Sequence, residues 1–380
     1  PGAQGGRWDG RRGFHSLADR HMTVPDAGPR SRFEGLPAYQ RAAVPEGTRL
    51  RLDANEGVPP TMDLVWSALH EHGAELFRRY PNARPLEAAL ARHHGVDASQ
   101  VFVGAGADEV VDRCCRAFLY PASTMLMAQP GFEMFEHYAA LCGARLAGVE
   151  WRRGPYPSDA VCRAIRDDVS MVALVTPNNP TGEVATIDDL RNIAAAAPNA
   201  LVVLDHAYVE FADQDLTPEA LAMPNVVVVR TFSKAWGLAG CRVGYAIGPR
   251  RIVQTLRAMG GPFPVSGVSL AVAGALLERG KAHRDAFVAR VRAERGTLFS
   301  VLEELGANPR ASQTNFVFCE TGPATLSLKA AMAREGIVVR AIVRGSGEAL
   351  GLRIALPGDA ASFEILVRAV RAALAEAGDA

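Results

Sequence analysis

The stretch LVVLDHAYVEFADQDLTPEALAMPNVVVVRTFSK, which covers residues 201–234, contains two continuous apolar runs, at residues 201–204 and 226–229. Each run has the length of a strand and is too short for a helix. Each is followed at once by a charged residue, Asp205 after the first and Arg230 after the second. Continuous apolar runs of this kind are typical of strands that are buried on both faces of a parallel sheet. The stretch therefore predicts two strands of such a sheet.

The same pattern continues on both sides of this stretch. From about residue 62 to residue 247, helix-like segments alternate with further short apolar runs, at residues 101–103, 124–127, 171–175 and 243–247. This alternation is typical of an α/β protein with a parallel sheet. It predicts a large domain at residues 60–262, built on a mixed, mostly parallel sheet with helices on both faces.

The two ends of the chain have a different pattern. A smaller α+β domain is predicted at residues 263–380, together with an N-terminal arm at residues 31–59. Its signs are a helical stretch and three strand-like segments, at residues 267–305, 315–319, 337–340 and 352–355. Residues 1–30 are rich in Gly and Arg and have few apolar side chains, which predicts a disordered leader.

Composition excludes several classes of protein. In 380 residues, 41 basic and 41 acidic side chains give a formal net charge of zero, which does not suggest a surface for nucleic acid or membrane. No apolar run reaches the roughly 18 residues of a membrane helix. The six cysteines form no Cys-x-x-Cys pair and the histidines have no ligand partners at metal spacing, so no metal site is predicted. Cysteines without a disulfide framework suit a cytoplasmic protein.

Polar residues follow the apolar runs at the ends where open sheets of this type bind ligands. After residues 101–103 come Gly104, Gly106, Ala107 and Asp108, and then a helical segment. A Gly-rich turn that opens a helix offers backbone N–H groups and a positive dipole end to a phosphate. A dinucleotide site is a weak alternative, because Glu109 stands where the third glycine would fall. An ordinary strand-to-helix turn also remains open.

Four side chains after other runs compose one site when they are taken together. Asp205 is a carboxylate at the buried end of a strand, which requires a cation. Lys234 follows another strand, where a desolvated amine can bind an aldehyde covalently. Asn179 and Tyr208 can hydrogen-bond a ring oxygen. Each residue alone is also compatible with a structural role, but together with the phosphate cradle they describe a site for pyridoxal 5′-phosphate.

Several motifs, in the same order, resemble those of the class I/II aminotransferases: NNPTG at residues 178–182, DHAY at 205–208 and SKAWGLAGCRVGY at 233–245. Within that superfamily the chain is most similar to the histidinol-phosphate aminotransferases. This likeness is carried by LDANE at 52–56, RYP at 79–81, ADE at 107–109, FEMF at 132–135, GIVVR at 336–340 and LRI at 352–354. The resemblance covers residues 32–375 and implies the fold type I of pyridoxal-phosphate-dependent transferases, as in aspartate aminotransferase.

The resemblance assigns a role to each site residue. It implies that Lys234 binds the cofactor covalently and moves a proton, that Asp205 pairs with the pyridine nitrogen, and that Tyr208 contacts the ring oxygen. It implies a homodimer, in which Tyr80 reaches the cofactor phosphate of the neighbouring subunit. The other residues that the resemblance places around the cofactor are Gly106, Ala107, Asp108, Phe132, Asn179, Thr231, Ser233 and Arg242.

The substrates are also implied by the resemblance. Arg353 matches an arginine that binds the donor carboxylate and Arg340 one near the substrate phosphate, while Asn55 is a third substrate-binding candidate. Surface ion pairs are the alternative for both arginines. The implied reaction converts L-histidinol phosphate and 2-oxoglutarate to imidazole-acetol phosphate and L-glutamate.

Departures from the family pattern leave other functions open. Ala107, His206 and Pro264 replace the usual residues at their positions, and the loop at residues 57–60 also differs. An aromatic or other amino-acid aminotransferase and a lyase similar to threonine-phosphate decarboxylases are therefore alternatives. A non-catalytic protein that senses the cofactor is a third, and the presence of both Lys234 and Asp205 argues against it.

Overall fold

The computed structural model describes residues 44–151, 153–344 and 347–378. These described residues belong to one compact unit. The predicted leader at residues 1–30 and the first part of the predicted arm lie outside the described residues. The boundary at residue 262 between a large and a small domain stays a prediction.

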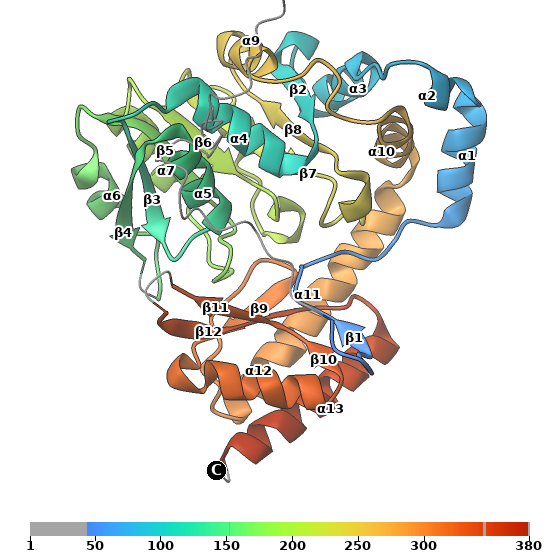
Figure 1. Cartoon of the computed structure of the whole chain (residues 1–380), viewed down its shortest axis with the longest axis vertical. Coiled ribbons are helices and arrows are strands. Elements are labelled where there is room, and N and C mark those ends of the chain that lie inside the picture. The colour runs from blue at the N-terminus through green and yellow to red at the C-terminus, as the bar shows by residue number, and fades with distance from the viewer. Residues whose placement is uncertain (1–43, 152, 345–346, 379–380) are drawn as a thin grey trace, which may run out of the picture. The chain divides into compact units, whose positions relative to one another are not determined.

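A seven-stranded sheet forms the centre of the fold (Figure 1). All neighbouring strands in it are parallel except β8, which is antiparallel to both of its neighbours. The predicted mixed, mostly parallel sheet is therefore confirmed. In sheet order, the strands are β2 (Val101–Gly104), β8 (Gly244–Ile247), β7 (Val226–Thr231), β6 (Leu201–Asp205), β5 (Val169–Val175), β3 (Thr124–Gln129) and β4 (Arg145–Glu150).

Six of these strands coincide with the predicted apolar runs, and the seventh, β4, was not predicted. Strands β6 and β7 are buried along their whole length, which explains why they read as continuous apolar runs. Strand β4 lies at the edge of the sheet, where its residues alternate between exposed and partly buried. Its sequence RLAGVE has no continuous apolar run, so the criterion that found the other strands missed it.

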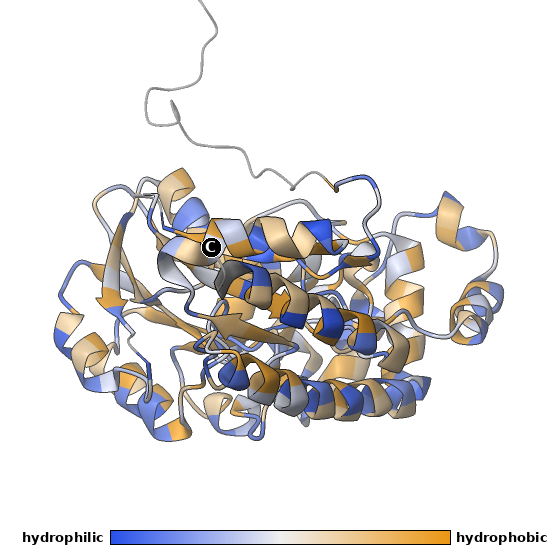
Figure 2. Ribbon diagram, turned by 90° about the horizontal axis from the view of Figure 1, so that it is seen from below, coloured by the Kyte–Doolittle hydropathy of each residue, from blue (hydrophilic) through white to orange (hydrophobic). Residues whose placement is uncertain are grey.

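Alternate residues of the strands pack against different helices, as the period of two along a strand requires. Met125, Met127 and Val203 belong to a core with α4 (Gly106–Phe118), α5 (Glu133–Cys142) and α9 (Arg250–Ala258). Leu126 and Val202 belong to a second core with α6 (Ser158–Ala164), α7 (Ile187–Ala196) and α8 (Thr217–Ala220). Hydrophobic colouring is concentrated on the strands, while the helices are banded (Figure 2).

A third core covers the β2 and β8 end of the sheet with Val103, Tyr245 and helical residues. The helices at this end are α1 (Met62–His72), followed by the short α2 (Glu75–Arg78), then α3 (Arg84–His94) and α10 (Gly267–Arg279). The helical stretch predicted at residues 267–305 is broken into α10 and α11 (Lys281–Glu304). The break falls at Gly280, where a Cβ would lie 2.8 Å from the carbonyl oxygen of Leu276.

The C-terminal part has its own core and two small sheets. One is antiparallel, in the order β11 (Arg340–Val343), β12 (Ala349–Ala355) and β9 (Phe316–Cys319); in the other, β1 (Leu50–Arg51) pairs in parallel with β10 (Ile337–Val338). Helices α11, α12 (Thr325–Arg334) and α13 (Ala360–Gly378) pack on them. In the described part of the chain, no helix is long and apolar enough to span a bilayer.

Candidate active site

The predicted site residues lie at or just after the carboxyl ends of strands that run in the same direction in the sheet. Asp205 is the last residue of β6, and Thr231 is the last residue of β7, which pairs with it. Lys234 follows three residues after Thr231, and Gly106 follows β2 at the start of α4. Because parallel strands end at the same edge of a sheet, their ends bring these residues into one region.

The turn that begins α4 forms a cradle with Arg242. Gly106 has a φ of +83°, and a Cβ on it would lie 2.4 Å from Nη2 of Arg242. Gly244 packs equally closely against this turn, since a Cβ on Gly244 would lie 2.3 Å from the backbone nitrogen of Ala107. Only residues without a side chain allow this approach. The guanidinium is thereby held beside the first turn of a helix, where a phosphate is favourably bound.

Hydroxyl groups complete this cradle. Arg242 donates from Nη2 to Oδ2 of Asp108 (3.0 Å) and from Nη1 to Oγ of Ser233 (3.4 Å). The backbone N–H of Ser233 donates to Oγ1 of Thr231 (3.0 Å). Thr231, Ser233, Asp108 and Arg242 therefore lie together, as a phosphate site built from them requires.

Asp205 is buried, and burial makes the ionised form of its carboxyl group unfavourable. Its Oδ1 accepts a hydrogen bond from the backbone N–H of Ala207 (3.1 Å). Burial raises the pKa of Asp205 to about 7, the nearby Asp108 adds to this, and the hydrogen bond and Lys234 oppose it. Among the described residues, no cationic side chain forms an ion pair with it. A protonated pyridine nitrogen is a cation of the kind that such a carboxylate requires.

Lys234 lies between the sheet and the segment that follows β1. Its Nζ donates to the carbonyl oxygen of Ala54 (3.1 Å) and lies 5.6 Å from the centre of the Tyr208 ring. Two glycines allow the close approach of this segment: a Cβ on Gly57 would lie 2.2 Å from the Lys234 carbonyl oxygen, and one on Gly237 would lie 1.9 Å from that of Val58. The lysine is therefore held by tight backbone packing.

The two predicted substrate arginines lie side by side. Arg340 on β11 is directly opposite Arg353 on β12, so their side chains leave the same face of the antiparallel pair. Arg353 is buried and donates to Oδ1 of Asn179 (2.6 Å) and to the carbonyl oxygen of Asp53 (2.7 Å), so it is not a surface ion pair. Arg340 forms an ion pair with the exposed Glu133 (3.0 Å). This contact is the surface ion pair that the sequence analysis left open as the alternative for Arg340.

Three other predicted residues have different surroundings. Asn55 is buried and donates from Nδ2 to the hydroxyl of Tyr208 (2.9 Å). Phe132 precedes α5 and packs edge-on against Phe135, with ring centres 6.3 Å apart. Tyr80 is 82% exposed and stacks on Phe263, so this chain does not bring its ring into the site.

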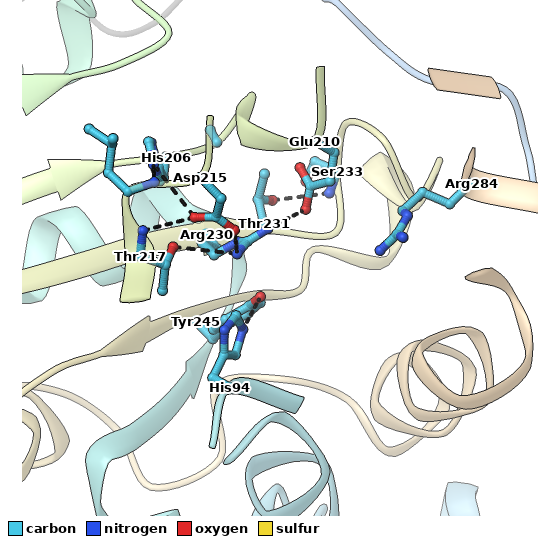
Figure 3. Close-up of polar contacts among 12 residues, drawn as sticks. His94, His206, Glu210, Asp215, Thr217, Arg230, Thr231, Ser233, Tyr245 and Arg284 are labelled. Atoms are coloured by element: carbon cyan, nitrogen blue, oxygen red, sulfur yellow. Dashed lines mark hydrogen bonds and ion pairs between the residues drawn. The ribbon is translucent and has the colours of Figure 1, made fainter. Parts of the chain in front are cut away.

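A polar network around the buried His206 and Arg230 was not predicted from the sequence (Figure 3). His206 bonds through Nδ1 to the carbonyl oxygen of Thr176, and its Nε2 accepts from the backbone N–H of Leu216 (3.1 Å). Burial lowers the pKa of His206 to about 4, so the ring is neutral at pH 7 and the Nδ1 bond is a donated one. His206 thus ties the end of β5 to the loop after β6, which explains how the departure at this position is accommodated.

Arg230 on β7 is the centre of the same network. It pairs with Glu210 (2.9 Å) and Asp215 (3.0 Å), and Asp215 lies 3.8 Å from Nε2 of His206. Partial burial alone would raise the pKa of Asp215, but Arg230 and the hydrogen bonds from Thr217 lower it to about 2. The signal for this network was a charged residue directly after an apolar run, the same signal that identified Asp205.

The residues fit a pyridoxal phosphate site and give no indication of a metal. The cradle of Gly106 and Arg242 suits the phosphate, and the buried Asp205 suits the pyridine nitrogen. In the described residues, no group of three or more His, Cys, Asp or Glu side chains is placed to hold a metal ion. The fold and the site define an α/β enzyme of the fold type I transferase class, with Lys234 just after β7 and the buried Asp205 at the end of β6.

Comparisons with known proteins give the family. The profile described as "Aminotransferase class I and II" matches residues 50–370, and the chain belongs to this family. It is 34% identical over 340 residues to the histidinol-phosphate aminotransferase of Geobacillus thermodenitrificans, covering 85% of this chain and 91% of that one. It is also 34% identical over 357 residues to the aromatic amino acid aminotransferase of Cutibacterium acnes, covering 89% and 97%.

A solved structure agrees with the fold. The histidinol-phosphate aminotransferase of Sinorhizobium meliloti, solved in complex with pyridoxal 5′-phosphate, superposes with a TM-score of 0.80 at 26% identity. The match covers 92% of this chain and 99% of that chain. The predicted fold and the predicted aminotransferase class are therefore confirmed.

Proposed function

We propose that this aminotransferase uses pyridoxal 5′-phosphate to transfer the amino group of L-histidinol phosphate to 2-oxoglutarate. The observation that carries the substrate proposal is the placement of Arg340 directly opposite Arg353, on one face of the β11–β12 pair. Such a pair can bind an anionic phosphate on one substrate and carboxylates on the other. The Geobacillus relative, named for this substrate, supports the same proposal.

The cofactor, when bound, supplies an electron sink for the negative charge that develops at the substrate Cα. The residues of the chain do the rest. Nζ of Lys234 would act as the base that takes the proton from the substrate Cα and delivers it to C4′ of the cofactor. The carboxylate of Asp205 keeps the proton on the pyridine nitrogen. The cradle around Arg242 holds the phosphate, and Arg353 orients the substrate carboxylate.

An aromatic amino-acid aminotransferase is the second candidate. It is supported by the Cutibacterium relative, which is as similar to this chain as the Geobacillus one. A decarboxylating lyase acting on threonine phosphate is a third reaction that the same cofactor residues could support. The donor therefore has to be measured.

Steady-state turnover with 2-oxoglutarate separates these candidates. We expect the wild-type protein to prefer L-histidinol phosphate to phenylalanine and tyrosine. We expect Arg340→Gln to raise the KM for histidinol phosphate by about tenfold or more, since a hydrogen bond to a charged group is worth about 1.5–3 kcal/mol. Its kcat/KM with phenylalanine is expected to change little.

Arg344→Gln is the matched control, because Arg344 follows β11 and, among the described residues, its side chain pairs with the nearby Glu348 (3.0 Å). It should leave both donors unaffected. If the wild type prefers an aromatic donor, the histidinol-phosphate assignment is wrong and the aromatic aminotransferase is favoured. If it releases CO2 from threonine phosphate without a keto acid, the reaction is decarboxylation and not amino transfer.

We also propose that the active form is a homodimer. Five large apolar side chains near α1, α2 and the segment before α10 are at least half exposed: Met62, Trp66, Phe77, Tyr80 and Phe263. Clustered exposed aromatic residues are typical of an interaction surface. A second copy covering this face would bring Tyr80 to the cofactor phosphate of its partner.

Sedimentation velocity is expected to give twice the mass of one chain, and Tyr80→Ala is expected to weaken cofactor binding by about tenfold. Tyr120→Ala is the control, since Tyr120 is also exposed but lies after α4. A monomer with full activity would refute the dimer. We place the protein in the cytoplasm, which its six free cysteines suit and which cell fractionation would check.

A further inference from the structure

Three consecutive residues after β1 each contact a different side chain of the site. The carbonyl oxygen of Asp53 accepts from Arg353 (2.7 Å), and the next one, of Ala54, accepts from Nζ of Lys234 (3.1 Å). The side chain of Asn55 then donates to the hydroxyl of Tyr208 (2.9 Å). This short segment therefore joins an arginine of the C-terminal part to two residues at the strand ends of the central sheet.

Asn55 is held rigidly in this segment. It is 1% exposed and has a φ of +54°, in the left-handed region that Asn tolerates better than most residues. Its carbonyl oxygen accepts from Nδ2 of Asn315 (3.1 Å). Within the described residues, its Oδ1 has no hydrogen-bond partner, so the one polar contact of the side chain is the bond to Tyr208.

This bond decides which way the Tyr208 hydroxyl donates. The ring of Tyr208 is buried and packs edge-on against Phe316, with ring centres 5.3 Å apart. A phenol has one proton, and an oxygen that already accepts from an amide can direct that proton elsewhere. The Nδ2 group of Asn55 occupies the acceptor side of the oxygen. The hydroxyl proton is left for another acceptor in the site.

We propose that Asn55 is a positioning residue for Tyr208, which makes the phenol a hydrogen-bond donor toward the ring oxygen of pyridoxal phosphate. This rests on the proposed function. It differs from the direct substrate contact that the resemblance implied for Asn55, because the residue acts through Tyr208. A donated hydrogen bond favours the anionic form of that ring oxygen. Loss of Asn55 therefore affects cofactor affinity and the pH at which the bound cofactor changes its absorbance.

The experiment uses the full chain and a double-mutant cycle. Asn55→Gly removes the amide at a φ that glycine adopts freely, and Asn55→Asp keeps the shape but replaces the donor by an acceptor. Tyr208→Phe and the double variant Asn55→Gly/Tyr208→Phe complete the set. Each protein is stripped of cofactor and titrated with pyridoxal phosphate to measure Kd, and the absorbance of the loaded protein is recorded against pH.

We expect Asn55→Gly to raise the Kd for pyridoxal phosphate about fivefold to tenfold, which corresponds to about 1–1.4 kcal/mol for the lost hydrogen bond, and to move the absorbance transition to higher pH. Asn55→Asp should do the same. The double variant should bind no more weakly than Tyr208→Phe alone, because the amide then has nothing to position. The KM for the amino donor should change less than the Kd.

Other outcomes overturn the proposal. If the two single effects multiply in the double variant, Asn55 acts independently of Tyr208. If Asn55→Gly raises only the KM for the donor, Asn55 contacts substrate directly. Should Asn55→Gly fail to fold, as thermal unfolding of the stripped protein would reveal, Asn55→Asp carries the test. Absence of any binding by the wild type would overturn the proposed function itself, a result distinct from the others.

Discussion

Lys234→Ala is expected to lower kcat for amino transfer by at least about 10⁴-fold. The side chain has two tasks, covalent attachment of the cofactor and movement of the proton at the substrate Cα, and a positioned base alone contributes about 10²–10⁴-fold. The phosphate cradle around Arg242 does not depend on this side chain, so the variant should still bind pyridoxal phosphate. A discontinuous assay of glutamate formation measures the loss of turnover, and a titration with pyridoxal phosphate measures the retained cofactor binding.

The composition of the chain makes the covalent link easy to map. The sequence contains three lysines, Lys234, Lys281 and Lys329. Reduction of the loaded protein with borohydride, followed by peptide mapping, is expected to label Lys234 alone. Lys281→Arg is the control, because Lys281 is exposed at the start of α11. Label on another lysine, or undiminished turnover by Lys234→Ala, would refute the role of Lys234.

Asp205→Asn is expected to lower kcat by about 10²–10³-fold, the usual effect of removing a preorganised electrostatic partner from a site. The amide has nearly the same shape but cannot hold a proton on the pyridine nitrogen. The variant should also bind the cofactor more weakly than the wild type, because a buried ion pair is lost. Steady-state kinetics and a titration of the stripped protein with pyridoxal phosphate measure these effects.

Asp205→Asn weakens catalysis and cofactor binding, but it is expected to stabilise the fold of the cofactor-free protein. The pKa of Asp205 is raised from 3.8 to about 7 in the fold, so the folded chain binds this proton more tightly than the unfolded chain. The resulting stabilisation is fully present below pH 4 and is lost as the pH rises to 7, at up to about 1.4 kcal/mol per pH unit. Asn does not titrate, so Asp205→Asn should become the more stable protein as the pH rises through this window.

Denaturant unfolding of the cofactor-free wild type and Asp205→Asn at pH 5 and pH 8 tests this prediction. The quantity compared is the difference between their free energies of unfolding, which should favour Asp205→Asn more at pH 8. Burial also raises the pKa of Glu294 to about 7, but Glu294 is present in both proteins and cancels. A difference in stability that is independent of pH would mean that Asp205 is already ionised and compensated in the cofactor-free protein.

Much of the fold could be predicted because a strand that is buried on both faces is apolar along most of its length. Strands β5, β6 and β7 satisfy this rule, and their apolar runs predicted them. Strand β4 does not, because one side of it lies at the edge of the sheet. The separation of α10 from α11 at Gly280 also left no mark in the apolar pattern, since both segments have helical periodicity.

The sequence by itself determined which residues stand at the ends of the strands, and therefore the presence of Lys234, Asp205 and the Gly106 turn at one edge of the sheet. Parallel strands share that edge whatever the details of packing. Only the tertiary structure decided that Arg340 lies opposite Arg353, that Asn55 bonds to Tyr208 and that His206 joins a buried network. These contacts depend on strand register and on segments up to 153 residues apart, such as Asn55 and Tyr208, whose meeting is set by packing and leaves no local pattern in the chain.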